Sequence, residues 1–436
     1  MHLEKNKTLK ALAIAATIPF VLTACASGTT ETSSESDSSS SGSDSSSSDT
    51  AQIEVFSWWT GGGEEAGLNA LVEVFNSEYP DIEFENGAVA GGAGTNARAV
   101  LATRLEANDP PASFQGHAGL ELLDYIQAGQ IEDLSFLYEE MGWSDVMPQE
   151  LLDLITVDGG IYSVPVNIHR ANVMWGNPEI LDEYNLDMPT TWDEFFEAAE
   201  VLQADGIIPL SLGEQWTQLH LFETVLLGEL GTDAYNGLWD GSTSWDSAEM
   251  TSALETFNRI YDYTNSDAAS LAWQDASQLV ISGDAAFNIM GDWAEGYFRV
   301  DNELVEQEGY TWAPSPGTDG TFQFLSDSFT LPVGAPDRDS TIAWLKVAGS
   351  AAGQDAFNVQ KGSIPARNDA DQSIYPPYLQ EAMDDWASNA GAPSLTHGTA
   401  ASNGWKAEIE TSLGLFLGTR DVATLQEGLV AAAAAQ

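Results

Sequence analysis

This chain of 436 residues is poor in cysteine and in basic residues. Its single cysteine, Cys25, excludes a disulfide within the chain and also the cysteine clusters of structural zinc sites. Only 14 lysines and arginines stand against 67 aspartates and glutamates, which gives a formal net charge of −53 at pH 7. Because so acidic a surface repels phosphate backbones, the composition excludes a protein that binds nucleic acid.

Apolar runs long enough to cross a membrane are also missing. The run over residues 11–22 is shorter than the roughly 20 residues that a permanent membrane-spanning helix needs. Three lysines precede it and small residues lead to Cys25, a pattern typical of a secretory signal peptide. The segment Leu22-Thr23-Ala24-Cys25 resembles a bacterial lipobox, which implies cleavage before Cys25 and a lipid on its sulfur. The alternative is an ordinary signal peptide with a chance cysteine.

We predict a lipoprotein signal peptide over residues 1–24 and a flexible Ser/Asp-rich tether over residues 25–50, because so polar a segment has nothing to bury. The protein is then exported, and the lipid on Cys25 is its only attachment to a membrane. It would be held on the outer face of the cytoplasmic membrane or in the periplasm. The folded body begins near Ala51, and its length of about 385 residues predicts two domains.

The acidic excess has two interpretations, a cation-binding polyelectrolyte or a solvated surface adapted to a saline medium. We favour the solvated surface, because the acidic residues are dispersed through segments with helical periodicity. The chain has no phosphate-binding loop and no EF-hand loop, and its five histidines are scattered along the sequence. We therefore expect neither a metal nor any other cofactor.

The first part of the body alternates predicted strands with predicted helices. The strands cover residues 53–57, 81–84 and 112–115, and the helices cover residues 64–77, 95–107 and 120–128. This repeat is typical of an α/β fold with a parallel sheet, in which ligands bind beyond the carboxyl ends of the strands. The residues just past those ends are Trp58, Trp59, Glu64, Gly92, Gln115 and His117.

The rest of the body is less regular. Thr191 and Glu194 are spaced as a capping box, which predicts the start of a helix. The chain then looks mainly helical to about residue 302. Further strands are expected over residues 161–166 and 329–333, and further helices over residues 340–349 and 352–360.

Five motifs, in this order, resemble the extracellular solute-binding proteins of sugar ABC importers, family 1. They are GIYSVPVN (160–167), WGNP (175–178), PTTWDE (189–194), AFNIMGDW (286–293) and KGSIPAR (361–367). Two more, VFSWWT (55–60) and FQGHAG (114–119), are similar to the branch that binds glucose, mannose or galactose. The resemblance covers residues 51–436. The acidic surface departs from the family, and so does Thr60, where another aromatic residue would be expected.

The resemblance implies a two-lobed α/β fold of the periplasmic-binding-protein type II, with a sugar cleft between discontinuous lobes. The first lobe would comprise residues 52–164 and 318–353, and the second residues 165–317 and 354–436. Hinge strands would lie near residues 162–166 and 313–317 and around Gly353.

A sugar site needs flat aromatic surfaces and a few fixed polar partners, and both are available in the first lobe. Trp58 and Trp59 are neighbours on a strand and should point to opposite faces, and by family position we assign Trp59 to the cleft. Glu64 begins a helix, where it is either a partner of the helix dipole or a ligand residue. Gln115 and His117 lie on one side of the chain past the third strand, and we assign both to the site.

In the second part of the chain the site residues rest on the resemblance. Matching family positions are occupied by Trp273, Trp293, Asp327, Lys361 and His397. The second choices are His169, Arg170 and Trp216, and His169 is expected to brace the cleft rather than to contact the ligand.

The resemblance implies high-affinity binding of a monosaccharide, glucose with mannose and galactose as alternatives, and its delivery to the transmembrane subunits of an ABC permease. The protein would act as a monomer and would not be an enzyme. A rival hypothesis is a secreted glycosidase, which needs two carboxylates about 5–10 Å apart. A second rival is a cell-surface carbohydrate adhesin on the same tether.

Overall fold

The structure is a computed structural model that describes residues 51–436. Cys25, the predicted signal peptide and the predicted tether lie outside the described residues. Over residues 51–436, none of the helices combines the length and the apolar character that crossing a membrane requires.

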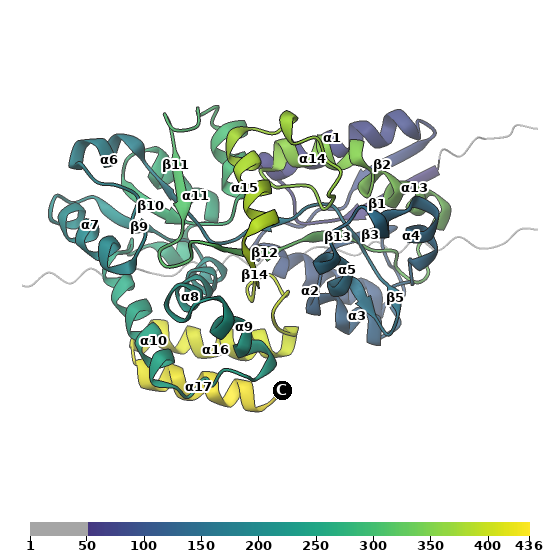
Figure 1. Ribbon diagram of the computed structural model, residues 1–436. Helices are drawn as coiled ribbons and strands as arrows, with labels where there is room; N and C mark the ends of the chain where they lie inside the picture. The colour runs from purple at the N-terminus through teal and green to yellow at the C-terminus, as the bar shows by residue number, and fades with distance from the viewer. Residues whose placement is uncertain (1–50) are drawn as a thin grey trace, which may run out of the picture. The chain divides into compact units, whose positions relative to one another are not determined.

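The first sheet has five strands in the order β2-β1-β3-β13-β6 (Figure 1). Its bounds are β1 (Ala51–Phe56), β2 (Ile82–Asn86), β3 (Ser113–His117), β13 (Asp327–Phe329) and β6 (Val164–Pro165). β1 pairs in parallel with β2 and β3, and β13 runs antiparallel between β3 and β6. The register of β13 sets Asp327 opposite His117, so a strand from late in the chain brings a carboxylate to the carboxyl end of β3.

Helices from both ends of the sequence pack on this sheet. The early ones are α1 (Gly62–Glu78), α2 (Thr95–Glu106), α3 (Leu123–Gln127), α4 (Ser135–Met141) and α5 (Gln149–Ile155), and the late ones are α13 (Arg338–Ala348) and α14 (Ala351–Lys361). α14 lies beside α1 (Figure 1). The approach is close at Gly67, where an added Cβ would lie 3.0 Å from Cβ of Lys361 and 3.1 Å from the carbonyl oxygen of Phe357. The pairing of α1 with α14 fixes Lys361, at the end of α14, near the first turn of α1.

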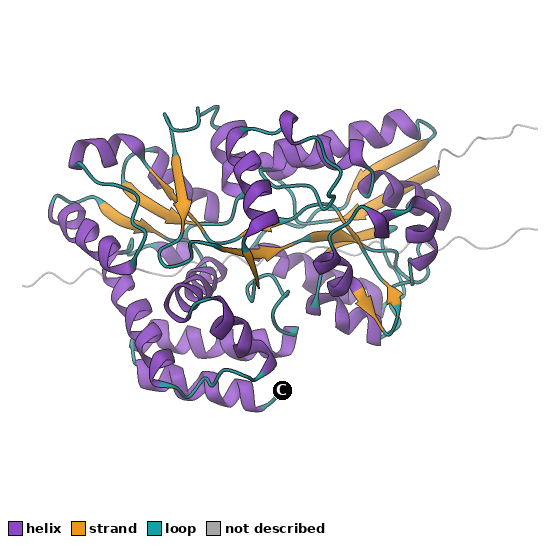
Figure 2. Cartoon of the chain, in the orientation of Figure 1, coloured by secondary structure: helices purple, strands orange, loops and turns teal. Residues whose placement is uncertain are grey.

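Two further sheets lie in the remaining part of the body (Figure 2). One has the order β11-β8-β10-β9 and the other β14-β12-β7, while β4 (Thr156–Val157) and β5 (Gly160–Ile161) form a separate hairpin. The bounds are β7 (His169–Arg170), β8 (Val173–Gly176), β9 (Ile208–Ser211), β10 (Ala285–Ile289), β11 (Thr311–Pro314), β12 (Thr321–Leu325) and β14 (Ala390–Pro393). β9 and β10 interrupt the region expected to be mainly helical.

The helices of this part are α6 (Pro178–Tyr184), α7 (Trp192–Ala204), α8 (Gln215–Leu230), α9 (Thr232–Asp240), α10 (Ala248–Ile260), α11 (Trp273–Ile281), α12 (Trp293–Gly296), α15 (Pro377–Ser388), α16 (Asn403–Thr419) and α17 (Val422–Ala434). Figure 2 shows α8, α9, α10, α16 and α17 gathered into a helical group. Apolar side chains of this part and of the first sheet form separate clusters, one around Phe222, Phe257 and Phe416 and another around Phe75, Phe114 and Trp344.

Several expected elements differ from the observed ones. The predicted strand over residues 161–166 is two short strands, β5 and β6, and the strand predicted over residues 329–333 ends at Phe329. The hinge strand expected around Gly353 is wrong, because Ser350 caps a helix there, its Oγ accepting a hydrogen bond from the Gly353 amide at 3.0 Å.

The lobe boundaries stay a prediction, and two segments bear on them. β12 pairs with β7 and β14 rather than with the first sheet, although its residues fall inside the predicted first lobe. α14 packs on α1, although most of its residues fall inside the predicted second lobe.

The predicted capping box begins α7. Oγ1 of Thr191 accepts from the amide of Glu194 at 3.2 Å, and the Glu194 carboxylate accepts from the amide of Thr191 at 3.2 Å.

We expect Thr191→Ala to lower the free energy of unfolding by about 1 kcal/mol, because the amide of Glu194 loses its partner. Urea unfolding measures the change. Thr411→Ala, at an exposed position inside α16, is the control and should not lower stability. Equal losses in both variants would contradict the capping role.

Candidate functional site

A cavity of about 210 Å³ opens where the first sheet meets the helices and loops of the later part of the chain. Its wall includes the residues after β1, the last residue of β3, the first turns of α1 and α11, and the start of β13. Eight of the nine predicted site residues line it: Trp59, Glu64, His117, Trp273, Trp293, Asp327, Lys361 and His397. Of the second choices, His169 and Trp216 also line it.

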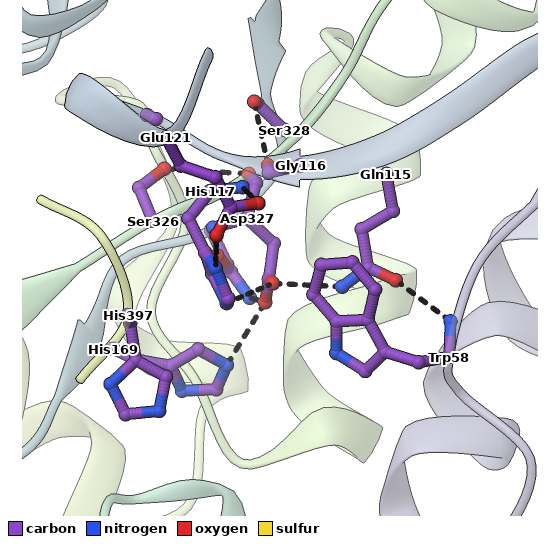
Figure 3. A network of polar contacts seen from close by, with 12 residues as sticks. Trp58, Gln115, Gly116, His117, Glu121, His169, Ser326, Asp327, Ser328 and His397 are labelled. Atoms are coloured by element: carbon purple, nitrogen blue, oxygen red, sulfur yellow. Dashed lines mark hydrogen bonds and ion pairs between the residues drawn. The ribbon is translucent and has the colours of Figure 1, made fainter. Parts of the chain in front are cut away.

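The ninth residue, Gln115, lies behind the wall instead of in it. Its Nε2 donates to Oδ1 of Asp327 at 2.9 Å, and its Oε1 accepts from the amide of Trp58 at 3.3 Å (Figure 3). Gln115 lies two residues further into β3 than His117, and Asp327 of β13 and Trp58 after β1 contact its side chain there. The expectation that Gln115 faces the ligand is therefore corrected to a supporting position behind Asp327.

Asp327 is the most heavily supported group of the wall. Asn167 donates from Nδ2 to its Oδ2 at 2.8 Å and accepts from its backbone amide at 2.7 Å. Nε2 of His169 lies 3.4 Å from Oδ2, and Nε2 of His117 lies 3.8 Å from Oδ1. Burial opposes the charge, but the adjacent His169, with His117 and Lys361, holds the pKa of Asp327 well below its ordinary value. The cavity therefore presents an ionised carboxylate in a fixed orientation.

His169 connects Asp327 to a second buried carboxylate. Its Nδ1 contacts Oδ1 of Asp292, whose Oδ2 accepts from the amide of Arg170 at 2.9 Å. Burial alone would lower the pKa of His169, but the Asp292 charge raises the pKa above its ordinary value. The carboxylates of Asp292 and Asp327 thus favour the charged form of His169, although burial also raises the pKa of Asp292. This position between two carboxylates is consistent with the expected bracing role.

Lys361 and Glu64 form the other charged pair of the wall. Nζ of Lys361 is 3.4 Å from Oε1 of Glu64 and about 6 Å from the ring centres of Trp59 and Trp293. Lys361 is only 2% exposed. Burial raises the pKa of Glu64, and the charge of Lys361 partly offsets this effect. A cation with aromatic rings on two sides can donate to a ligand oxygen while remaining paired.

Five tryptophans supply flat apolar surface around these charges: Trp58, Trp59, Trp216, Trp273 and Trp293. Trp58 and Trp59 both line the cavity, so the expectation that one of them is core and the other cleft is wrong. β1 ends at Phe56, and beyond the strand end the alternation of side chains no longer applies. Trp59 also packs on Phe357, with 4.9 Å between ring centres.

All four histidines of the described residues gather at this site, although they are far apart in the sequence. The rings of His117 and His397 are 5.3 Å apart, and those of His220 and His397 are 5.8 Å apart. Nδ1 of His117 is bound to the buried carboxylate of Glu121 at 2.8 Å. The charges of Arg98 and His117 outweigh burial and lower the pKa of Glu121 to about 2.

Sequence reasoning missed some supporting residues that had a signal. Asn167 and Asp292 lie inside the motifs at residues 160–167 and 286–293, and Asp292 directly precedes the chosen Trp293. Glu121 lies four residues after His117, in the turn that follows β3. Glu214 and Gln274 also line the cavity, and they lie within two residues of Trp216 and Trp273.

Comparisons with known proteins agree with this geometry. Residues 60–355 match the family described as bacterial extracellular solute-binding protein. The chain belongs to this family. An ABC transporter extracellular-binding protein of Pyrococcus horikoshii, itself uncharacterized, is 33% identical to this solute-binding protein over 377 residues, 85% of each chain. The xylose/arabinose-binding protein XacG of Haloferax volcanii is 33% identical over 391 residues, 88% of this chain and 84% of its own.

Solved structures extend the likeness to the fold. The bacterial solute receptor AcbH superposes on this solute-binding protein with a TM-score of 0.77 at 15% identity, covering 88% of this chain and 98% of its own. The predicted two-lobed α/β fold of the family is therefore confirmed.

Proposed function

We propose that this solute-binding protein holds a monosaccharide in the cavity and delivers it to the permease of an ABC importer. The observation that carries the proposal is the ionised carboxylate of Asp327, fixed by Gln115 and Asn167 in a cavity that five tryptophans also line. A pyranose has an apolar C–H face, which suits a flat ring, and hydroxyls, which donate to a carboxylate. Both kinds of surface meet in this one cavity.

The sugar class is supported by the relatives. XacG is named for xylose and arabinose, two monosaccharides, and this chain matches most of its length. We put glucose first, with mannose and galactose as alternatives, because the motifs at residues 55–60 and 114–119 are similar to that branch. The nine predicted site residues keep their proposed roles except Gln115, which we now assign to positioning Asp327.

We also propose that the ligand is bound without being altered. Contacts to one ligand from residues of both presumed lobes would favour a closed arrangement, by as much as the ligand binds that arrangement more tightly. The closed form would then be the state that the permease recognises, and the protein would act as a monomer.

Calorimetric titration tests the proposal directly. The purified body, residues 51–436, is titrated with glucose, mannose, galactose, xylose and maltose, and the sugars are recovered afterwards. Tight binding of one monosaccharide that is recovered unchanged would support the proposal. Cleavage of maltose would instead indicate a glycosidase, and the absence of binding to any of the sugars would overturn the proposal.

Trp273 supplies a second test. It is the first residue of α11 and only 9% exposed, with one face on the cavity. We expect Trp273→Ala to weaken sugar binding by about tenfold or more, because an aromatic contact contributes roughly 1 kcal/mol beyond the area that it buries. Trp386→Ala is the matched control, since Trp386 packs on Phe322 outside the cavity. Equal affinities in wild type and Trp273→Ala would show that this wall does not contact the sugar.

The predicted lipid on Cys25 would keep the receptor within reach of its permease. We expect Cys25→Ala, expressed in a lipoprotein-processing bacterium, to move the protein from the membrane fraction to the soluble exported fraction. Sugar affinity should not change, because the folded body begins near residue 51. A variant that stayed in the membrane fraction would contradict the lipid anchor.

A further inference from the structure

We infer that Glu223, which does not line the cavity, fixes His397 through Ser394 so that Nε2 of His397 accepts a hydrogen bond from the ligand. The inference deepens the proposed function and rests on it for the identity of the ligand. Glu223 is thus a positioning residue, and three observations support this role.

The first is the attachment of the Glu223 carboxylate to the loop that carries His397. Glu223 lies in α8 and is fully buried. Its Oε2 accepts from the backbone amides of Leu395 and Thr396, the latter at 3.2 Å. Two backbone donors on Oε2 fix the orientation of the carboxylate and leave Oε1 for Ser394.

The second contact is the hydroxyl of Ser394, which has one proton for two neighbours. Its Oγ lies 2.9 Å from Oε1 of Glu223 and 2.9 Å from Nδ1 of His397. An ionised carboxylate has no proton to give, so the hydroxyl donates to Glu223 and must accept from His397. His397 therefore carries its proton on Nδ1.

The third observation concerns the other ring nitrogen of His397. Burial and the nearby His117 and His220 hold the pKa of His397 well below its ordinary value, so the ring is neutral and Nε2 has a free lone pair. No residue in the described part of the chain hydrogen-bonds this Nε2, and His397 lines the cavity. The wall at His397 is thus an acceptor for a ligand hydroxyl.

His220 preserves this arrangement when Glu223 gains a proton. Burial raises the pKa of Glu223 to about 7, so both of its forms are populated near neutral pH. Nε2 of His220 contacts the carbonyl oxygen of Ala171 at 3.0 Å and so carries the proton of that ring. Nδ1 of His220 is then bare; it has no hydrogen-bond partner among residues 51–436 and lies 3.6 Å from Oε1 of Glu223.

A proton on Oε1 of Glu223 can therefore be directed at His220, and Ser394 continues to donate to Glu223. The other titratable groups around Glu223 and His397 are Tyr235, Lys406, His117 and His169. None of these occupies the space between Ser394 and its two partners, so the role of His397 does not depend on which form of Glu223 is present.

Glu223→Gln should reverse the role of His397 with almost no change of volume. The backbone amides of Leu395 and Thr396 require an acceptor, so the amide oxygen takes the place of Oε2 and the NH₂ group takes the place of Oε1. That group donates to Ser394, and the Ser394 hydroxyl then donates to Nδ1 of His397. The proton of His397 moves to Nε2, which becomes a donor toward the cavity.

Nitrogen-15 NMR of the histidine rings reads this change without any sugar. We expect a protonated Nδ1 for His397 in the wild type and a protonated Nε2 in Glu223→Gln. Glu229→Gln, at an exposed position of the same helix, is the control and should match the wild type. A protonated Nε2 in the wild type, or the same tautomer in both proteins, would overturn the inference.

Calorimetry with glucose and its monofluorinated derivatives gives the functional measurement, because fluorine cannot donate. In the wild type one derivative, the one altered at the hydroxyl facing His397, should bind about tenfold more weakly than glucose. In Glu223→Gln the ratio between the affinities for glucose and for this derivative should be smaller than in the wild type by a factor of about three or more. If the wild type binds the sugar but His397 carries its proton on Nε2, only the inference about Glu223 is overturned. If His397 carries its proton on Nδ1 but no sugar binds, only the proposed function is overturned.

A metal ion is the alternative occupant of this cluster, since ligand atoms of His220, Glu223 and His397 lie within 4.8 Å of one another. A metal on Nδ1 of His397 would place the ring proton on Nε2. Wild-type protein dialysed against Zn²⁺ is therefore analysed for bound metal. One tightly held zinc per chain, lost in His220→Ala, would overturn the inference, and no retained zinc would support it.

Discussion

Asp327→Asn should cause the largest loss of sugar affinity of any change in the cavity, about a hundredfold. Hydrogen bonds to a charged group contribute about 1.5–3 kcal/mol each, and the substitution removes the charge that strengthens them. The substitution also disturbs hydrogen bonds within the protein. Both carboxylate oxygens accept from protein donors, Oδ1 from Gln115 and Oδ2 from Asn167, and an amide can satisfy only one of the two.

Calorimetric titration of Asp327→Asn with the sugar measures this loss of affinity. Asp319→Asn is the matched control, because Asp319 is exposed and is not one of the residues that line the cavity. It should bind as the wild type does. An Asp327→Asn variant that folds, as shown by circular dichroism, and binds within about threefold of the wild type would rule out the carboxylate as a ligand group.

The same variant should also change the acid stability. The folded pKa of Asp327 lies below its unfolded value of about 3.9, so its contribution is complete above that value and is lost as the pH falls toward the folded pKa. The free energy of unfolding of the wild type should therefore fall more steeply below about pH 4 than that of Asp327→Asn.

The first half of the body could be predicted from local patterns. β1, α1, β2, α2 and β3 form where the alternation of predicted strands, turn residues and helices places them, and α1 also carries a clear apolar stripe. The rule that ligands bind beyond the carboxyl ends of strands then pointed to Trp59, Glu64 and His117, all of which line the cavity.

The geometry of the site depends on pairings that local patterns do not contain. β13 enters the first sheet more than 200 residues after β3, and only this pairing brings Asp327 over Gln115 and removes Gln115 from the cavity wall. The convergence of His220 and His397 likewise depends on α8 meeting the loop after β14. Here family resemblance supplied Asp327 and His397, whereas the supporting residue Glu223 lies in no motif and needed the three-dimensional contacts.

The buried pair of His169 and Asp292 leads to the largest predicted loss of stability. Both side chains are almost completely inaccessible, at 1% and 0% exposed. We expect Asp292→Asn to lower the free energy of unfolding by about 3 kcal/mol, because it leaves the His169 cation buried with only Asp327 to balance it. The backbone amide of Arg170 also competes with His169 for the single remaining oxygen.

A double-mutant cycle separates the charge pairing from the packing. His169→Gln removes the cation, so Asp292→Asn should cost less in that background than in the wild type, by about 1.5 kcal/mol or more. Urea unfolding of the four proteins at pH 7 gives the coupling energy. Additive losses would mean that the two groups are independent, and His169 would then lack the charge that we assign to it. Since that charge lowers the pKa of Asp327 more than the charges of His117 and Lys361 do, additivity would also weaken the physical reason for the strong carboxylate acceptor in the cavity.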